Sequence, residues 1–170
     1  MASEEKLSLS LNIDKNICKV GDTINISYEL KNNSEDSIRI TALGFWSVDK
    51  IKIFDTSGKA MRGIKIAKYS IRIIPKEDDF TTIQPKDSFL VSLKGKIKYG
   101  SIDIGEAYKG LYLDFGDSCI LLPGGEGIYL LKGVAKGNEA WQQEGEKRYS
   151  FSNIWAGEIE SEAVEIRFLK

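Results

Sequence analysis

The chain has 170 residues, 42% of them hydrophobic, which predicts a single globular domain spanning residues 1–170. Its 24 Lys and Arg residues against 25 Asp and Glu residues leave a net charge of -1, which gives no electrostatic reason to expect nucleic acid as a partner. The chain contains no histidine and two cysteines, which excludes Ser-His-Asp and Cys-His catalysis, His-ligated zinc and a four-cysteine metal site. No membrane-spanning segment is expected, because no stretch is apolar for long enough to cross a bilayer.

The first forty residues predict three strands separated by polar turns. Apolar residues alternate with polar ones in two runs: Leu7, Leu9, Leu11 and Ile13 in the first, and Ile24, Ile26, Tyr28 and Leu30 in the second. This period of two is typical of strands that bury one face. Residues 14–16 predict a turn and residues 31–37 a polar loop, because Asn, Ser and Asp favour local bonds to the backbone. Ile38 and Ile40 indicate the third strand.

The middle of the chain predicts shorter strands. A hairpin is expected around residues 56–58, with apolar residues on both arms: Ile51, Ile53, Ile64 and Ile66. Two further strand-like pieces stop at Pro75 and at Pro85, since proline cannot donate to a central ladder. Phe89, Val91 and Leu93 alternate as in a strand. Residues 111–115 also suit a strand, and residues 106–111 are compatible with a short helical turn.

The last third predicts a buried strand over residues 127–135, a long polar segment from Lys136 to Ser150, and a closing strand. Val164, Ile166 and Phe168 alternate with charged residues in that closing strand. No stretch of twelve residues carries the apolar stripe of a helix, and about eight to ten strands follow one another at the spacing of a sandwich or barrel. The prediction is therefore a single all-β domain.

Three stretches resemble immunoglobulin-like β-sandwich domains of bacterial surface and periplasmic proteins. They are "LSLSLNIDKNICKVGDTINISYELKNNSEDSI", "IQPKDSFLVSL" and "GGEGIYLLKGVA" with the closing Trp-Ala-Gly strand. Gly127, Tyr129 and Leu131 match the pattern of a tyrosine corner, with Leu131 at the position of the antibody-domain cysteine. The resemblance implies an immunoglobulin-like antiparallel β-sandwich of the disulfide-free kind. Residues 45–115 exceed a minimal domain of this type, so an enlarged middle region is expected.

The chemically reactive residues point to no cofactor and no metal. Cys18 and Cys119 are either a disulfide across the sandwich or two buried thiols, and the sequence leaves both open. The acidic run Glu77, Asp78 and Asp79 matches no calcium loop, so we interpret it as solvated. The glycines before Tyr129 precede a strand rather than a helix, so they predict a turn and not a phosphate cradle. The Tyr129 hydroxyl is expected to bond to the backbone a few residues upstream.

The polar segment 136–150 is the strongest candidate for recognition. It places Trp141 among Asn138, Gln142 and Gln143, and an aromatic side chain in a polar loop is either a contact for a partner or a cap over the core. In the immunoglobulin order this loop lies at the same end as the loop that contains Asn33 and Ser34. The expected ligand site therefore comprises six residues: Trp141, Asn138, Gln142, Gln143, Asn33 and Ser34. The other two tryptophans, Trp46 and Trp155, are expected to pack in or against the core.

These features predict a non-enzymatic binding module whose end loops recognise a protein or carbohydrate ligand. The resemblance implies an extracellular, periplasmic or cell-surface location. The alternative is a proteinase inhibitor that uses the same end loops. An enzyme working through carboxylates alone is the third class, but no motif among the acidic residues supports it.

Overall fold

The structure is a computed structural model that describes residues 6–41, 47–66, 80–137, 141–144, 147–150 and 154–170. Trp46, the strand expected before Pro75, the acidic run 77–79 and Asn138 lie outside these residues. Nearly all of the described chain is strand, and α1 (Ser47–Lys50) is a single helical turn. Fifteen strands are described, more than the eight to ten expected, in part because short strands such as β2 are separated from their neighbours by turns.

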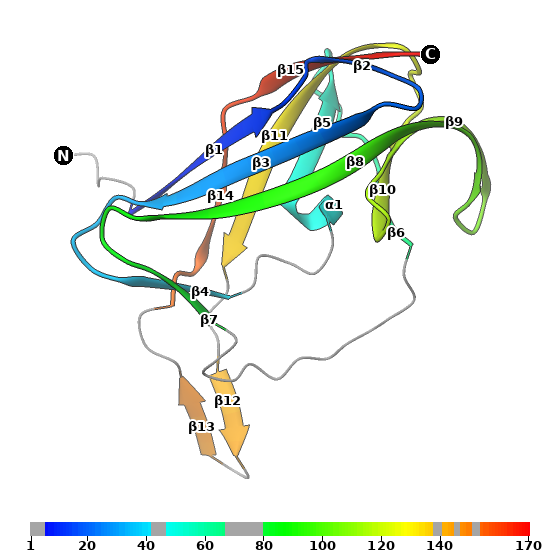
Figure 1. The fold of residues 1–170 in the computed structure, drawn as a ribbon. Coiled ribbons are helices and arrows are strands. Elements are labelled where there is room, and N and C mark those ends of the chain that lie inside the picture. The colour runs from blue at the N-terminus through cyan, green and yellow to red at the C-terminus, as the bar shows by residue number, and fades with distance from the viewer. Residues whose placement is uncertain (1–5, 42–46, 67–79, 138–140, 145–146, 151–153) are drawn as a thin grey trace.

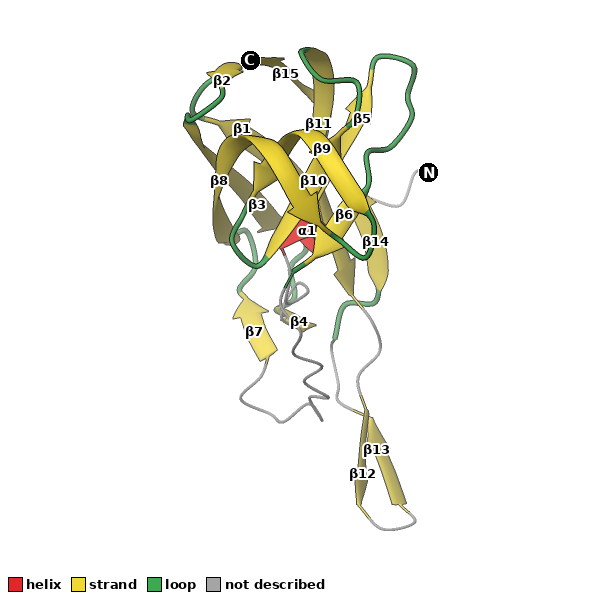
Figure 2. Cartoon of the chain, turned by 90° about the vertical axis from the view of Figure 1, so that its right-hand side faces the viewer, coloured by secondary structure: helices red, strands yellow, loops and turns green. Residues whose placement is uncertain are grey.

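Two sheets make up the body of the molecule (Figures 1 and 2). The first has six strands, in the order β1 (Leu7–Ile13), β3 (Thr23–Asn32), β8 (Ser88–Asp103), β9 (Ala107–Asp114), β10 (Ser118–Leu122) and β6 (Gly63–Lys65). In the second, β11 (Gly127–Gly137) pairs with β14 (Gly157–Glu160), β15 (Val164–Leu169) and β5 (Ile51–Asp55), and β2 (Ile17–Lys19) pairs with β15. The β2–β15 pair is parallel and the other pairs in these sheets are antiparallel. The predicted all-β sandwich is confirmed.

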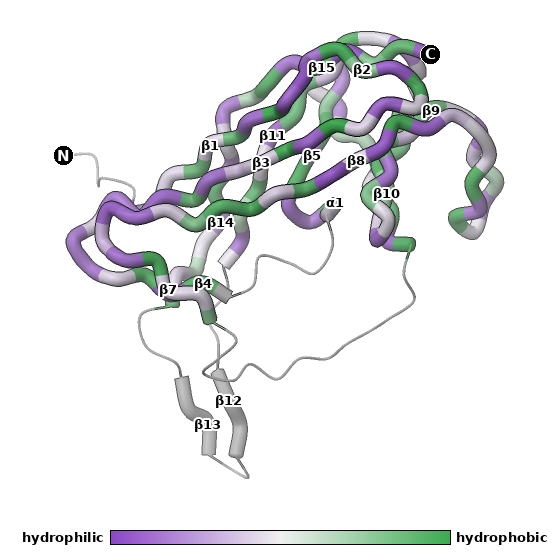
Figure 3. The backbone as a smooth tube through the Cα atoms, viewed as in Figure 1, coloured by the Kyte–Doolittle hydropathy of each residue, from purple (hydrophilic) through white to green (hydrophobic). Residues whose placement is uncertain are grey.

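The core lies between the two sheets and consists of the inward residues that the period of two predicts. Along β1 and β3 the buried positions are Leu7, Leu9 and Leu11, and then Ile24, Ile26, Tyr28 and Leu30. Figure 3 shows the same alternation as hydrophobic and polar residues that succeed each other along these strands. Ile166 and Phe168 of β15 are buried opposite them, and each such side chain contributes about 1.5–3 kcal/mol through burial. This shared core holds both sheets in place.

The tyrosine corner forms as predicted. The hydroxyl of Tyr129 donates a hydrogen bond to the carbonyl oxygen of Gly125, 2.9 Å away and four residues upstream. Gly125 has a φ of +72°, a conformation that side chains with a Cβ rarely adopt, so glycine is needed in this turn. The ring of Tyr129 also meets the Phe168 ring edge-on, with 5.5 Å between centroids. The corner therefore fixes the start of β11 against the end of β15.

Two predictions for the middle of the chain are wrong in detail. The hairpin around residues 56–58 forms as a short one, with Phe54 bridged to Ala60 and the Met61 amide bonded to the Ile53 carbonyl, but the returning arm leaves it before Ile64. Instead β6 crosses to the other sheet, where Ile64 lies opposite Cys119, and Ile66 is exposed. Residues 107–114 form β9 rather than a helical turn, because the chain reverses at Gly105, which has a φ of +88°. Alternation predicts which face of a strand is buried, but it does not identify the neighbouring strand.

Candidate ligand-binding end

Two small sheets lie at one end of the sandwich. β4 (Ile38–Thr41) pairs with β7 (Phe80–Ile83), and β12 (Trp141–Glu144) pairs with β13 (Lys147–Ser150). Both views place these pairs below the body of the molecule (Figures 1 and 2). A parallel bridge between Arg39 and Ile154 connects β4 to the segment after β13, and the Trp155 amide donates to the Arg39 carbonyl over 2.8 Å. The strand that follows the Asn33–Ser34 loop is thus joined to the segment that follows the β12–β13 hairpin.

The loop between β3 and β4 is organised by Asn32, a fully buried side chain. Its amide nitrogen lies 2.8 Å from the carbonyl oxygen of Asp36, 3.0 Å from that of Ile83 and 3.2 Å from that of Gln84. Its side-chain oxygen accepts from the amide and the hydroxyl of Ser34, at 2.9 and 2.7 Å. One side chain therefore joins the β3–β4 loop to the end of β7.

Backbone and charged groups add to this connection. The Asn32 amide donates to the Asp87 carbonyl, and the Lys86 amide donates back to the Asn32 carbonyl, at 2.9 and 3.0 Å. The Lys86 ammonium contacts the Asn33 carbonyl at 2.9 Å and the Glu35 carboxylate at 2.6 Å. Both charged side chains are largely exposed, so the ion pair adds little to stability beyond the buried amide bonds. The two loops form one braced unit.

Asn33 and Ser34 are therefore parts of a loop with a defined internal structure. The Ser34 hydroxyl lies within hydrogen-bond distance of both Asn32 Oδ1 and the Asp36 carbonyl, so its hydrogen is used inside the loop. The role of both residues as ligand contacts stays a prediction. Asn32 is not among the predicted site residues, although one feature of the sequence indicates its structural role. It occupies the next inward position after Leu30 in the alternation of β3, and a polar residue at a buried position requires partners.

The β12–β13 pair stands apart from the rest of the sheet structure. Trp141 lies opposite Ser150, Gln142 opposite Tyr149, and Gln143 opposite Arg148. Neither strand pairs with any other strand in the described part of the chain. Successive positions of a strand belong to opposite faces, so the positions of Trp141 and Gln143 share one face and that of Gln142 belongs to the other.

Trp155 packs at the base of this hairpin, as predicted for a residue that supports the last strands. Its half-buried side chain contacts the hydrophobic core. The ring lies over Gly137, the last residue of β11. A Cβ at that glycine would lie 2.3 Å from the Trp155 carbonyl oxygen and 2.5 Å from Cε3 of its ring. Glycine is therefore required at position 137, and Trp155 fixes the point at which the chain leaves the sandwich.

Charged side chains cover the outer face of the second sheet beside this base. Lys52 of β5 forms ion pairs with Glu160 at 2.7 Å and Glu158 at 3.4 Å, and Lys132 and Lys136 of β11 pair with the same two carboxylates. Hydrogen bonds from Lys136 to Glu158 and from Lys52 to Glu160 lower the pKa of both carboxyl groups. These groups are exposed, so they make a solvated ladder rather than a catalytic pair.

Cys18 and Cys119 are both buried and free, which settles the alternatives left open by the sequence in favour of two thiols. Burial raises the pKa of Cys18 to about 11, and it also raises the pKa of Cys119. At neutral pH both sulfurs are protonated, and the thiolate is the nucleophilic form. These cysteines behave as small apolar core residues.

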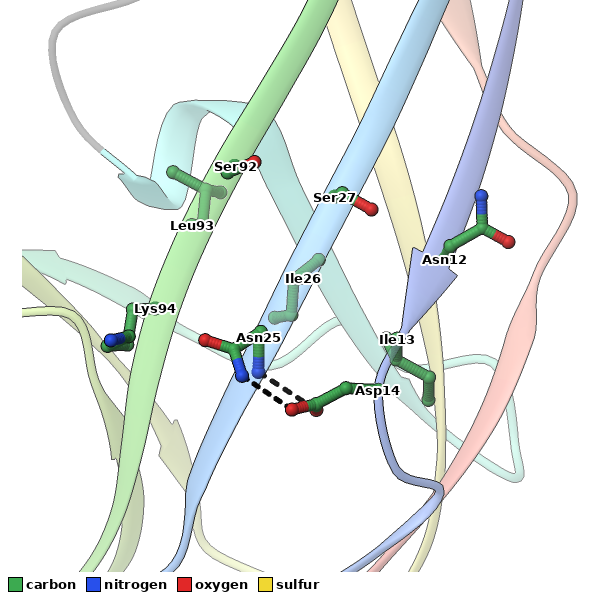
Figure 4. Close-up of a pocket in the computed structure, with 9 residues that line it drawn as sticks. All are labelled: Asn12, Ile13, Asp14, Asn25, Ile26, Ser27, Ser92, Leu93 and Lys94. Atoms are coloured by element: carbon green, nitrogen blue, oxygen red, sulfur yellow. Dashed lines mark hydrogen bonds between the residues drawn. The ribbon is translucent and has the colours of Figure 1, made fainter.

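Two shallow depressions lie elsewhere. One, of about 420 Å³, runs over β1, β3 and β8 and is lined by residues that include Asp14, Asn25 and Lys94 (Figure 4). The other, of about 610 Å³, lies beside the tyrosine corner between residues such as Asp55 and Arg167. Neither contains any of the six predicted ligand-site residues. Among the described residues, no group of three or more Cys, Asp or Glu side chains is arranged to hold a metal ion, and no helix is long and apolar enough to cross a membrane.

Comparisons with known proteins add little to this description. No model of a known protein family matches the chain, and no curated protein matches it in sequence. One solved structure with a similar chain path is a β-glucosidase from Erythrobacter marinus, at a TM-score of 0.42 and 10% identity. The similarity covers 96% of this chain and 15% of the β-glucosidase. At that score it carries no argument about fold or activity, and the geometry of the chain itself has to support the functional proposal.

Proposed function

We propose that this chain is a non-catalytic binding module that recognises a protein or carbohydrate ligand through the end that carries β4–β7 and β12–β13. The observation that carries the proposal is the β12–β13 hairpin, which pairs with neither large sheet and extends away from them (Figure 1). An isolated two-stranded hairpin is marginally stable in water, and contact with a partner compensates for this. Binding residues commonly lie on such projecting elements, held in position by a rigid scaffold.

The scaffold beneath the hairpin suits this role. The Asn32-braced loops and the packing of Trp155 on Gly137 provide fixed points on both sides of the end. Trp141 is the residue of the hairpin with the largest expected contribution, because aromatic side chains dominate the energetics of protein and sugar recognition. The buried, protonated thiols offer no nucleophile, which supports a binding role over catalysis.

An immunoglobulin-like identity for the sandwich belongs to the same proposal. The neighbours β1, β3 and β8 in one sheet, and β5, β11 and β15 in the other, resemble the A-B-E and C-F-G groupings of such domains. The bond from Tyr129 to Gly125 fits the tyrosine corner of that fold. The placement of β9 and β10 after β8 departs from the usual order. Bacterial relatives of this type imply an extracellular, periplasmic or cell-surface location.

The test is substitution of Trp141 by alanine. Binding of the intact chain and of Trp141→Ala is measured on an array of bacterial and host glycans and on a panel of immobilised extracellular proteins. The proposal expects loss of at least about 1.4 kcal/mol of binding free energy, a tenfold weakening, with an unchanged melting temperature. Tyr99→Ala is the matched control, because Tyr99 is an exposed aromatic residue on β8, away from this end. Equal binding by Trp141→Ala and the intact chain would refute the assignment.

The second candidate is a proteinase inhibitor, favoured by one observation. Inhibitor loops resist cleavage and bind tightly because they are held rigid before binding, and Asn32 holds the β3–β4 loop in this way. Serine, cysteine and metalloproteases assayed with micromolar amounts of the protein separate the two functions. Inhibition that is lost in Asn32→Ala supports the inhibitor, whereas no inhibition across the panel eliminates it.

A further inference from the structure

In the described part of the chain, β1 is an edge strand with no strand paired to its outer side. It pairs with β3 alone, and no other strand of the described chain lies beside it in the sheet. Lys6 and Asp14, at its two ends, form backbone bonds to Asn33 and Asn25. Backbone groups in an antiparallel strand point alternately to one side and the other, so those of Leu7, Leu9, Leu11 and Ile13 point away from β3. β1 thus presents a row of backbone donors and acceptors that no described strand pairs.

The composition of β1 does not protect this edge. Edge strands are commonly short, or carry charges that discourage further pairing. The other edges of the two large sheets follow that rule. β2 and β6 have three residues each and contain Lys19 and Lys65, β5 contains Lys52 and Asp55, and β14 contains Glu158 and Glu160. β1 has seven residues and no charge. It is the one edge among these that accepts another strand without electrostatic cost.

The charges that flank β1 identify the strand that fits it. If a second copy pairs antiparallel with β1 about a two-fold axis at Ser10, Leu9 of each copy lies opposite Leu11 of the other, and Leu7 opposite Ile13. These are the residues whose backbone groups point outward, so the hydrogen bonds match. In the same register Lys6 of each copy lies opposite Asp14 of the other. Both side chains are exposed, and their opposite charges make this register favourable at both ends.

The Asp14 carboxylate is held on the side of β1 that faces β3, so the lysine of a second copy reaches it across the end of the strand. Its carboxylate accepts from the Asn25 amide at 2.9 Å and from the Asn25 side chain at 2.5 Å, as drawn in Figure 4. These bonds lower the pKa of Asp14, so it carries its negative charge at neutral pH. Between Lys6 and Asp14, the side chains on the solvent face of β1 are small and polar: Ser8, Ser10 and Asn12. Nothing bulky on that face opposes a neighbouring strand.

We propose that two copies of this chain associate along β1, antiparallel about Ser10, and join their six-stranded sheets into one continuous sheet. This association uses a different surface from the proposed ligand-binding end. It gives each dimer two such ends.

Oligomeric state and cross-linking test the pairing. Light scattering of the full chain up to about 1 mM is expected to give twice the 19.0 kDa of the monomer. In Ser10→Cys the two new thiols face each other at a non-hydrogen-bonded pair, where the Cα atoms are about 4.5 Å apart and a disulfide can close. Mild oxidation should then give a covalent dimer. Ser92→Cys, also exposed and on the same face but on the central strand β8, should give little covalent dimer.

A charge exchange tests the register. Lys6→Glu alone places two acidic residues opposite each other at both ends, and Asp14→Lys alone places two lysines there, so each variant should be at least tenfold weaker in self-association. Mixed together, they restore both opposite-charge pairs and should form a heterodimer. Circular dichroism establishes that each variant is folded. A wild-type chain that stays monomeric at about 1 mM, or equal cross-linking at Ser10→Cys and Ser92→Cys, would overturn the proposal.

Discussion

Two regions at the same end of the sandwich are built in opposite ways. The β3–β4 loop uses the buried amide of Asn32 to satisfy its own carbonyl groups and those at the end of β7. Among the described strands, β12 and β13 pair only with each other. The difference suggests that the β3–β4 loop contributes to stability and the β12–β13 hairpin to recognition. A loop with its polar groups satisfied internally holds the end together, whereas a hairpin with unpaired edges is available to a partner.

The largest loss of stability at this end of the sandwich is expected from Asn32→Ala. The substitution leaves the buried carbonyl group of Ile83 and the partly buried ones of Asp36 and Gln84 without their donor, and a buried group left unsatisfied costs about 1–3 kcal/mol. We expect a loss of about 3 kcal/mol in the free energy of unfolding, measured by urea denaturation. Asn16→Ala, in an exposed turn, is the control. A loss below about 0.5 kcal/mol in Asn32→Ala would mean that the loop is not braced in this way.

Trp155→Ala tests the base of the hairpin. Replacing a fully buried tryptophan by alanine lowers the free energy of unfolding by about 3–5 kcal/mol. Because Trp155 is half-buried, a loss of about 2 kcal/mol is expected. Trp141→Ala is the comparison, since a residue that serves recognition should change stability by less than about 0.5 kcal/mol. Thermal unfolding of both variants measures the difference. Equal losses would remove the distinction between the two tryptophans.

Ser34→Ala has a smaller expected effect and bears on the predicted ligand site. The hydroxyl bonds to Asn32 Oδ1 at 2.7 Å, and its removal should cost about 1 kcal/mol of stability. Ligand affinity then separates two roles: it stays within about twofold of the intact chain if the hydroxyl only supports the loop, and it falls further if Ser34 contacts the ligand as predicted. A tenfold loss of affinity with unchanged stability would identify Ser34 as a ligand contact.

The sequence predicted the fold more fully than the site, for physical reasons that particular residues illustrate. Ile24, Ile26, Tyr28 and Leu30 are buried because a period of two specifies the face of a strand. Tyr129 formed its corner because the turn and its acceptor are local in sequence. The crossing of β6 to the other sheet depends on a strand more than fifty residues away, which no local pattern encodes. The brace at Asn32 likewise depends on carbonyl groups of residues 83 and 84.

The most direct test replaces residues 138–153 with a Gly-Ser linker of about four residues, which can span the gap because Gly137 lies opposite Gly157 in the sheet. Ligand binding and melting temperature are measured on the same preparation. The account predicts that the shortened chain melts within about 2 °C of the intact chain and binds none of the glycans or proteins that the intact chain binds. Full binding by the shortened chain, or no binding by the intact chain, would contradict the assignment of recognition to the hairpin.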